Sequence, residues 1–246
     1  LIKVGPIFSR SCASSSAFAS PVVVSTDASS SSASCQTLLR PHIEATVQRL
    51  RPQKVVLAVQ DTSTLSYTGH APDGAGPVGR SQDEAVGLLL HDTLAFTVAG
   101  TPLGLLNVQC WARDAEQLGK RYRRKELPLE QKESFKWLVS YRAVAEAQRL
   151  CPETMLVSVG DREADIYEFF HEAVSTPGGP KVLVRAERTR NRRVGDTPVW
   201  ELLERQPLAG TIDVQVPRRG SRRCQSVVGQ PNCCLFVGMN ECILII

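Results

Sequence analysis

Apolar residues recur at helical spacing in two segments of the chain, residues 37–50 and residues 130–150. Pro41 interrupts the first of these helical patterns near its start. In the second segment one helical face gathers five apolar side chains, and Arg142 and Glu146 fall within the same sector. The five are Phe135, Leu138, Val139, Ala143 and Leu150. We therefore expect two helices, of which the second has a face that is not purely apolar.

Runs rich in apolar and β-branched residues predict strands around these helices. The first run, residues 54–61, is followed by a stretch rich in glycine and proline, residues 65–83, which should form a loop. Residues 85–100 and 101–112 predict two strands joined at Gly100, that is, an antiparallel hairpin. The later elements are strands at residues 155–160, 181–187 and 210–216, and helices at residues 163–173 and 200–205.

This order of elements predicts an α/β fold. A hairpin followed by strands that are joined through helices gives a mixed sheet with flanking helices. The periodic pattern occupies residues 37–217, which we interpret as the folded core. Residues 1–36 are rich in serine and alanine and nearly uncharged, so we expect a disordered low-complexity segment. Residues 218–246 lose the periodicity and gain cysteines, and we interpret them as an atypical tail.

Composition narrows the class of protein only in part. Apolar residues make up 42% and charged residues 22% of the 246, as is ordinary for a soluble globular protein. The 8 cysteines follow neither a metal-finger nor a secretory spacing, which favours free thiols in a reducing compartment. Because no apolar run reaches the roughly 18 residues of a membrane span, and no signal peptide is indicated, we expect a cytoplasmic protein without membrane contact.

The net charge of +4 is concentrated in basic runs. Lysine and arginine are dense at residues 120–125, 185–193 and 218–223. Such clusters can neutralise phosphates and release counterions, which favours a nucleic-acid partner. The alternative interpretation of each run is a solvated loop.

Two of the predicted strands end in an aspartate, the first in Asp61 and the strand at residues 155–160 in Asp161. If these strands lie side by side, the two carboxylates emerge close together and need a compensating cation. Ligation by oxygen alone suits Mg²⁺ or Mn²⁺, which support the cleavage and transfer of phosphodiesters. The alternative for either residue alone is an N-cap that begins the next helix.

The segments around the two acids resemble a known enzyme family. LAVQDTSTLSYTGH, which contains Asp61, and SVGDREADIYEFF, which contains Asp161, are similar to the first and second acidic motifs of bacterial DDE transposases of the insertion-sequence-four family. The similarity extends to LLRPHIEATVQRLRPQ, QKESFKWL and KVLVRAERTRN, and so covers residues 37 to about 220. These cut-and-paste enzymes have a catalytic core of the ribonuclease H type.

The resemblance implies a ribonuclease H-like fold, DNA cleavage and strand transfer with Mg²⁺ or Mn²⁺, double-stranded transposon ends as partner, and a homodimer. Asp61 and Asp161 match the first two catalytic, metal-ligating acids, and Thr62 matches the hydroxyl residue that usually follows the first acid. Arg185 matches an arginine that contacts DNA near the active site, and its alternative is an edge-strand surface residue. We extend the DNA-binding expectation along the same basic run to Arg188, Arg190, Arg192 and Arg193.

Other residues of the matched segments are expected to be structural. His70, at the end of the family-typical YTGH run, should pack within a loop, and Trp111 and Trp137 should lie in the core. Asp165 is expected in the first turn of the helix after Asp161, with Glu168 and Glu172 on the solvated face of that helix.

The sequence departs from the family pattern at the third catalytic acid. In the family this acid is a glutamate in a Tyr–Arg–Glu–Lys signature on a late helix, and no segment of the sequence matches that signature. The candidate glutamates in the later part of the chain lack the flanking Tyr, Arg and Lys of the signature; they are Glu187, Glu201, Glu204 and Glu241. The sequence therefore predicts a truncated transposase, with a fold incomplete at the C-terminus. The alternatives are a catalytically inactive fragment that binds DNA or inhibits an intact transposase, and a non-functional remnant.

Overall fold

Strand β1 (Val55–Tyr67) occupies the centre of the main sheet in the computed structural model. The structure describes residues 35–79, 85–117, 127–187, 189, 193–205, 212–216, 225–229, 233–236 and 242–245. β1 pairs antiparallel with β3 (Val86–Thr97) on one side and parallel with β5 (Met155–Gly160) on the other. The sheet is therefore mixed, as the order of elements predicts.

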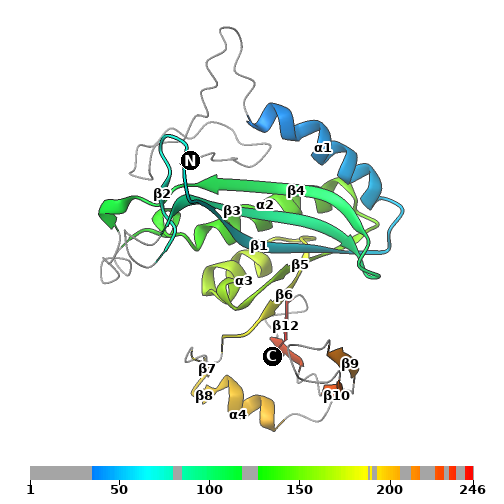
Figure 1. Cartoon of the computed structure of the whole chain (residues 1–246). Helices are drawn as coiled ribbons and strands as arrows, with labels where there is room; N and C mark the ends of the chain where they lie inside the picture. Colours follow the sequence, from blue (N-terminus) through cyan, green and yellow to red (C-terminus); the bar gives the residue numbers. More distant parts are fainter. Residues whose placement is uncertain are drawn as a thin grey trace.

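β3 turns back into β4 (Pro102–Trp111), and the two strands form the antiparallel hairpin expected from the sequence. Gly100 makes the turn possible because its φ of 86° lies in the left-handed region, which glycine adopts without strain. Its N–H donates to the carbonyl of Thr97 over 2.9 Å. At the other end of β3, the short β2 (Gly76–Pro77) adds two paired residues. Figure 1 shows β1, β3 and β4 as long strands that run side by side.

Parallel strands continue the sheet beyond β5. β6 (Lys181–Arg185) pairs with β5, and β12 (Cys242–Ile245) pairs with β6, both in parallel. β11 (Cys233–Phe236) is antiparallel to β12. The sheet thus runs β11-β12-β6-β5-β1-β3-β2, with β4 on β3. Its last two strands come from residues 218–246, the segment interpreted from sequence as an atypical tail.

Three helices pack on one face of this sheet: α1 (Cys35–Leu50), α2 (Phe135–Leu150) and α3 (Tyr167–Val174). A first apolar cluster joins α1 and α2 to the strands; its members are Val47, Leu50, Val56, Ala58, Ala95, Leu106, Val144, Ala147, Cys151 and Leu156. A second joins α2 and α3 to β6; its members are Trp137, Leu138, Tyr141, Ala164, Phe169, Ala173, Val182 and Val184. The expectation of an α/β fold with a mixed sheet and flanking helices is confirmed, and Trp137 lies in the core.

The remaining elements follow β6 and precede β11. They are β7 (Arg193–Val194), β8 (Thr197–Pro198), α4 (Val199–Glu204), β9 (Ile212–Val216) and β10 (Gln225–Gly229). α4 and β9 match the helix and the strand expected there. In the described part of the chain, no helix is both long enough and apolar enough to cross a membrane.

The structure corrects the expected core face of α2. Trp137, Tyr141 and Val144 are fully buried, whereas Leu150 is 44% exposed. α2 packs against both the sheet and α3, so its buried sector is wider than a single apolar stripe and includes large aromatic side chains. Arg142 lies outside this buried sector and forms a bidentate ion pair with Glu172 of α3, with contacts of 2.5 and 2.7 Å. Glu172 is therefore paired with α2 rather than simply solvated.

β1 is longer than its hydrophobic pattern predicts. Leu65 and Tyr67, which fall in the expected loop, pair through the backbone with Leu88 and Val86 of β3. Both side chains are exposed, at 40% and 38%. Because backbone pairing at an exposed strand end needs no buried side chains, it leaves no alternation in the sequence from which to predict it.

Asp165 does not lie in a first helical turn. It follows a short 3₁₀ helix, Arg162–Ala164, and precedes α3. Its side chain is 1% exposed, and its Oδ2 accepts the N–H of Glu187 over 2.9 Å. Asp165 is thus a buried carboxylate that accepts a backbone N–H after β6, and not the expected first-turn helix acid.

Candidate metal centre

Asp61 and Asp161 lie at corresponding positions of two neighbouring parallel strands. The backbone register of β1 with β5 ends at the pair Val59–Val159. Each aspartate follows two residues later in its own strand direction, so both emerge at the same edge of this parallel pair. The structure therefore brings together the two acids that the sequence predicts as a pair, although they are 100 positions apart.

One oxygen of each carboxylate accepts a local backbone hydrogen bond. Oδ1 of Asp61 accepts the N–H of Thr62 over 2.7 Å, and Oδ1 of Asp161 accepts the N–H of Glu163 over 2.8 Å. The second bond makes Asp161 the N-cap of the 3₁₀ helix, so the alternative interpretation of this residue is also correct structurally. Both aspartates are exposed. Among the described residues, the second carboxylate oxygen of each accepts no hydrogen bond.

The side chain of Thr62 forms a hydrogen bond with a buried histidine. Its Oγ1 lies 2.9 Å from Nδ1 of His91, which is fully buried and packs edge-on against Trp137 with ring centres 4.7 Å apart. The pKa of His91 is lowered from 6.5 to about 3, mainly by burial and also by the charge of Lys136, while a hydrogen bond with the backbone of Asp61 acts in the opposite direction. The ring is therefore neutral at pH 7, with one donor nitrogen and one acceptor nitrogen.

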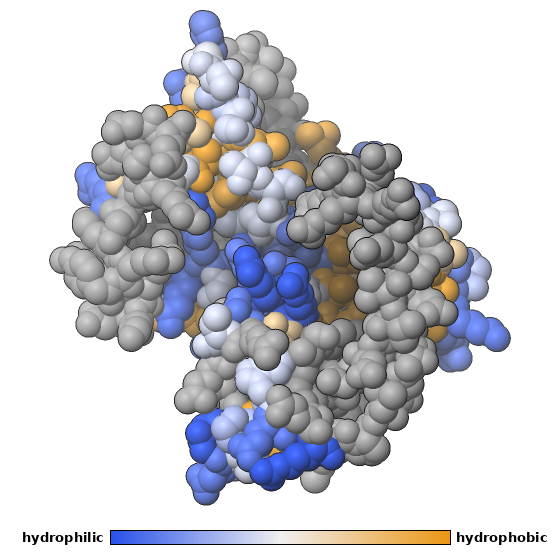
Figure 2. Space-filling model, turned by 60° about the horizontal axis from the view of Figure 1, so that its bottom comes forward, coloured by the Kyte–Doolittle hydropathy of each residue, from blue (hydrophilic) through white to orange (hydrophobic). Residues whose placement is uncertain are grey.

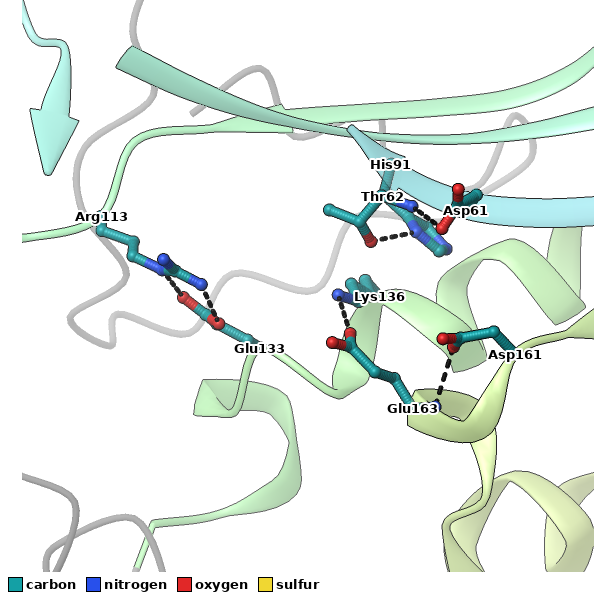
Figure 3. A network of polar contacts seen from close by, with 8 residues as sticks. All are labelled: Asp61, Thr62, His91, Arg113, Glu133, Lys136, Asp161 and Glu163. Atoms are coloured by element: carbon teal, nitrogen blue, oxygen red, sulfur yellow. Dashed lines mark hydrogen bonds and ion pairs between the residues drawn. The ribbon is translucent and has the colours of Figure 1, made fainter. Parts of the chain in front are cut away.

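A lysine ion pair lies in the same neighbourhood. Nζ of Lys136 is 3.2 Å from Oε2 of Glu163, and its side chain is only 9% exposed. The same ammonium lies over the rings of Trp111, at 5.8 Å, and of Trp137, at 5.6 Å, a cation–π arrangement. Figure 3 shows this pair close to Asp61 and Asp161. Sequence reasoning missed Lys136, since its pattern marks a polar helix position but not a buried one.

A third acid lies directly across from Asp61. Asp92 of β3 is its partner in the antiparallel register, so both side chains point to the same face of the sheet. Burial raises the pKa of Asp92, and the negative charge of Asp61 raises it further. The sequence gives no direct sign of this proximity, because it depends on the register of the hairpin.

The two aspartates suit part of the coordination shell of a hard cation. Carboxylate oxygens are the ligands that Mg²⁺ and Mn²⁺ prefer, and such ions usually keep several waters or substrate oxygens. Asp61 and Asp161 could each contribute the oxygen that accepts no local N–H. Within the described ranges, no group of three or more His, Cys, Asp or Glu residues is arranged to hold a metal ion. The residues present thus fit a two-carboxylate site.

The predicted DNA-binding arginines are only partly described. Arg185 ends β6 and is exposed, and its register partner on β12 is Ile245, so it does not lie on an edge strand. Arg193 lies in β7 and is exposed. Arg188, Arg190 and Arg192 lie outside the described residues.

Of the glutamates considered for the third acid, Glu187 is 3.9 Å from Arg162 and Glu201 pairs with Arg205. Glu241 lies outside the described residues. No protein-family model matches the chain.

Proposed function

We propose that Asp61 and Asp161 hold a divalent cation, Mg²⁺ or Mn²⁺, in a transposase core that cleaves and joins DNA. The observation that carries this proposal is the position of the two acids, two residues beyond the last register pair of parallel strands β1 and β5. Both acids also lie in the segments that resemble the insertion-sequence-four transposases.

The topology of the sheet supports a core of the ribonuclease H type. The antiparallel strands β4, β3 and β1 are followed in space by the parallel strands β5 and β6, which are joined through helices. The first acid then lies on the central strand and the second on its parallel neighbour. In such an arrangement, substrate could reach the acids at their shared edge of the β1–β5 pair without disturbing the helix-covered face.

The chain's own residues would orient the two ligands and balance their charge. The N–H groups of Thr62 and Glu163 each fix one oxygen of a carboxylate, which leaves the other oxygen for the cation. The ammonium of Lys136 adds a positive charge near two acids that repel each other. A bound Mg²⁺ would supply Lewis-acid stabilisation of the negative charge on a phosphodiester.

A DNA duplex is the proposed substrate, and a homodimer that joins two transposon ends is part of the same proposal. The exposed guanidinium of Arg185, on the strand next to β5, could contact backbone phosphates. In the view of Figure 2, hydrophilic residues gather in the middle of the described surface, with apolar residues beside them.

Exposed arginines at β6 and β7 also favour a second function, DNA binding without cleavage. Phosphate contacts from Arg185 and Arg193 would need neither aspartate. Such a protein would bind duplex DNA in a salt-sensitive way and would interfere with an intact transposase by occupying its ends.

Calorimetric titration of Mn²⁺ tests the first proposal. The wild type should bind, and Asp61→Ala/Asp161→Ala should not. Asp114→Ala is the matched control, because the Asp114 carboxylate accepts the N–H of Glu116 over 2.9 Å, a local bond of the kind Asp161 makes. This control should bind as the wild type does.

A plasmid nicking assay with Mg²⁺ then separates the two functions. Nicking that disappears in Asp161→Ala would support a transposase core. Salt-sensitive DNA binding with neither Mn²⁺ binding nor nicking, in a folded wild type, would refute the metal site and support the second function.

A further inference from the structure

A buried side-chain hydrogen bond joins β1 to β5 close to the two acids, between residues that precede Asp61 and Asp161 in their strands. Nε2 of Gln60 donates to Oγ of Ser158 over 2.6 Å. Gln60 is 2% exposed and Ser158 is fully buried. The two residues are 98 positions apart in the sequence, so this bond belongs to the assembled sheet and not to a local turn.

On β1 the bond starts one residue past the last backbone pair with β5, and on β5 it ends at Ser158, which is paired with Ala58. The last register pair of β1 with β5 is Val59–Val159, and Gln60 is the next residue of β1, directly before Asp61. On β1 the buried amide therefore adds a contact with β5 one residue closer to Asp61 than the backbone register provides.

Stability alone does not account for an amide at this position. Oε1 of Gln60 and Oγ1 of Thr93, its register partner on β3, are buried and have no hydrogen-bond partner within the described structure. A buried polar atom without a partner costs free energy that an apolar side chain of similar size would not. What the amide offers instead is a directional contact, whereas methionine or leucine would allow the two strands to shift relative to each other.

We propose that Gln60 is a positioning residue for the cation site. Through Ser158 it fixes the part of β1 that directly precedes Asp61 against β5, and so holds the Asp61 and Asp161 carboxylates at the separation that a divalent cation needs. This inference rests on the proposed function of the two aspartates. It assigns to Gln60 no contact with the cation or the substrate.

The test compares Gln60→Met with Gln148→Met. Gln148 is also a buried glutamine, 7% exposed, and its amide bonds to the chain that leads into β5: to the carbonyl of Thr154 over 2.7 Å and the N–H of Leu156 over 2.9 Å. It thus braces β5 at the end far from Asp161. Both changes keep the side-chain volume and remove a buried amide.

We expect Gln60→Met to weaken Mn²⁺ binding about 10-fold in calorimetry, the lower end of the effect of residues that orient metal ligands. Gln148→Met should leave the affinity within about 2-fold while lowering the stability in urea, because it strips several backbone groups of their partners. A purely structural role of Gln60 would produce the opposite split, with lower stability and unchanged affinity.

Amide hydrogen exchange of the metal-free protein gives a second readout. Peptides that contain Asp61 and Asp161 should exchange faster in Gln60→Met than in the wild type, and should exchange at the wild-type rate in Gln148→Met. Unchanged exchange in Gln60→Met overturns the positioning role.

The outcomes also separate this inference from the function on which it rests. If the wild type binds Mn²⁺ through the aspartates and Gln60→Met binds equally well, the positioning role alone is overturned. If a folded wild type binds no Mn²⁺, the proposed function fails and takes the role of Gln60 with it.

Discussion

Gly160 is the residue of β5 at which one added methyl group should be felt most directly by the site. It is buried, and it immediately precedes Asp161. A Cβ built at this position would lie 2.5 Å from Cβ of Ala164 and 3.2 Å from Cζ3 of Trp137. The first distance is shorter than any normal carbon–carbon contact, so the 3₁₀ helix that Asp161 caps would have to move.

The expected cost follows from two opposing effects. Overpacking of a filled site destabilises by about 1–3 kcal/mol. Since Gly160 does not have a positive φ, alanine suits its backbone and returns about 0.4–1 kcal/mol by restricting the unfolded chain. We therefore expect Gly160→Ala to lower the free energy of unfolding by about 1–2 kcal/mol.

Ala164→Gly removes the atom that causes the nearest overlap and so provides a double-mutant cycle. Alone it should cost about 1–2 kcal/mol, from a lost buried methyl group and a more flexible backbone. If the contact between the two Cβ atoms is what destabilises Gly160→Ala, the double variant should be more stable than the sum of the two single effects by about 1 kcal/mol.

Urea unfolding measures all four proteins, with Gly69→Ala as control. Apart from Gly69 itself and its two chain neighbours, no residue has an atom within 4 Å of a Cβ at this position, and its φ is not positive, so this variant should be as stable as the wild type or slightly more so. A Gly160→Ala protein that unfolds at the wild-type urea concentration, or single effects that simply add, would refute the reasoning.

Two further predictions concern buried ionisable groups. The pKa of His91 falls from 6.5 to about 3 on folding, so below pH 6.5 the unfolded chain binds a proton at this histidine that the folded chain does not bind. The free energy of unfolding should therefore fall as the pH falls below 6.5. Between about pH 7 and pH 5, the free energy of unfolding in urea should fall by about 2 kcal/mol less in His91→Gln than in the wild type. An equal fall in both proteins would contradict this account. Asp165→Ala should destabilise by about 1–3 kcal/mol, since the N–H of Glu187 loses its acceptor. In thermal unfolding, a change no larger than that of the half-buried Glu168→Ala would show that this bond contributes little.

The bounds of β5 could be predicted from the sequence because its signals are local, whereas the end of β1 could not. β5 is an apolar run that is followed by an aspartate, and its bounds, Met155–Gly160, agree with the predicted range. The β3–β4 hairpin also has local signals, two apolar runs and the glycine between them. The proximity of Asp61 and Asp161 followed from one further assumption, that their strands lie side by side, and the register of β1 with β5 supports it.

The environment of the site could not be predicted in the same way. Lys136 is nearly buried because α2 presents it to Trp111 and Glu163, residues that a helical pattern does not connect with it. Asp165 has the sequence signature of a helix start, yet a contact with the segment after β6 determines its place. Gln60 looks like a polar residue in a strand, and its partner is 98 positions away. Each of these contacts arises from the assembled fold, beyond the reach of a single window of sequence.

The helix-covered face of the sheet changes in character along the strands. Near the start of β1 it presents Val56 and Ala58 to the apolar cluster, and towards Asp61 it presents Gln60, beside buried Thr93 and Ser158. Apolar packing accepts many side chains of the right volume, whereas a directional polar contact accepts few. The two parts of this face should therefore differ in evolvability. Near Val56 and Ala58 many apolar substitutions should be neutral, whereas near Gln60, beside the acids, few substitutions should be.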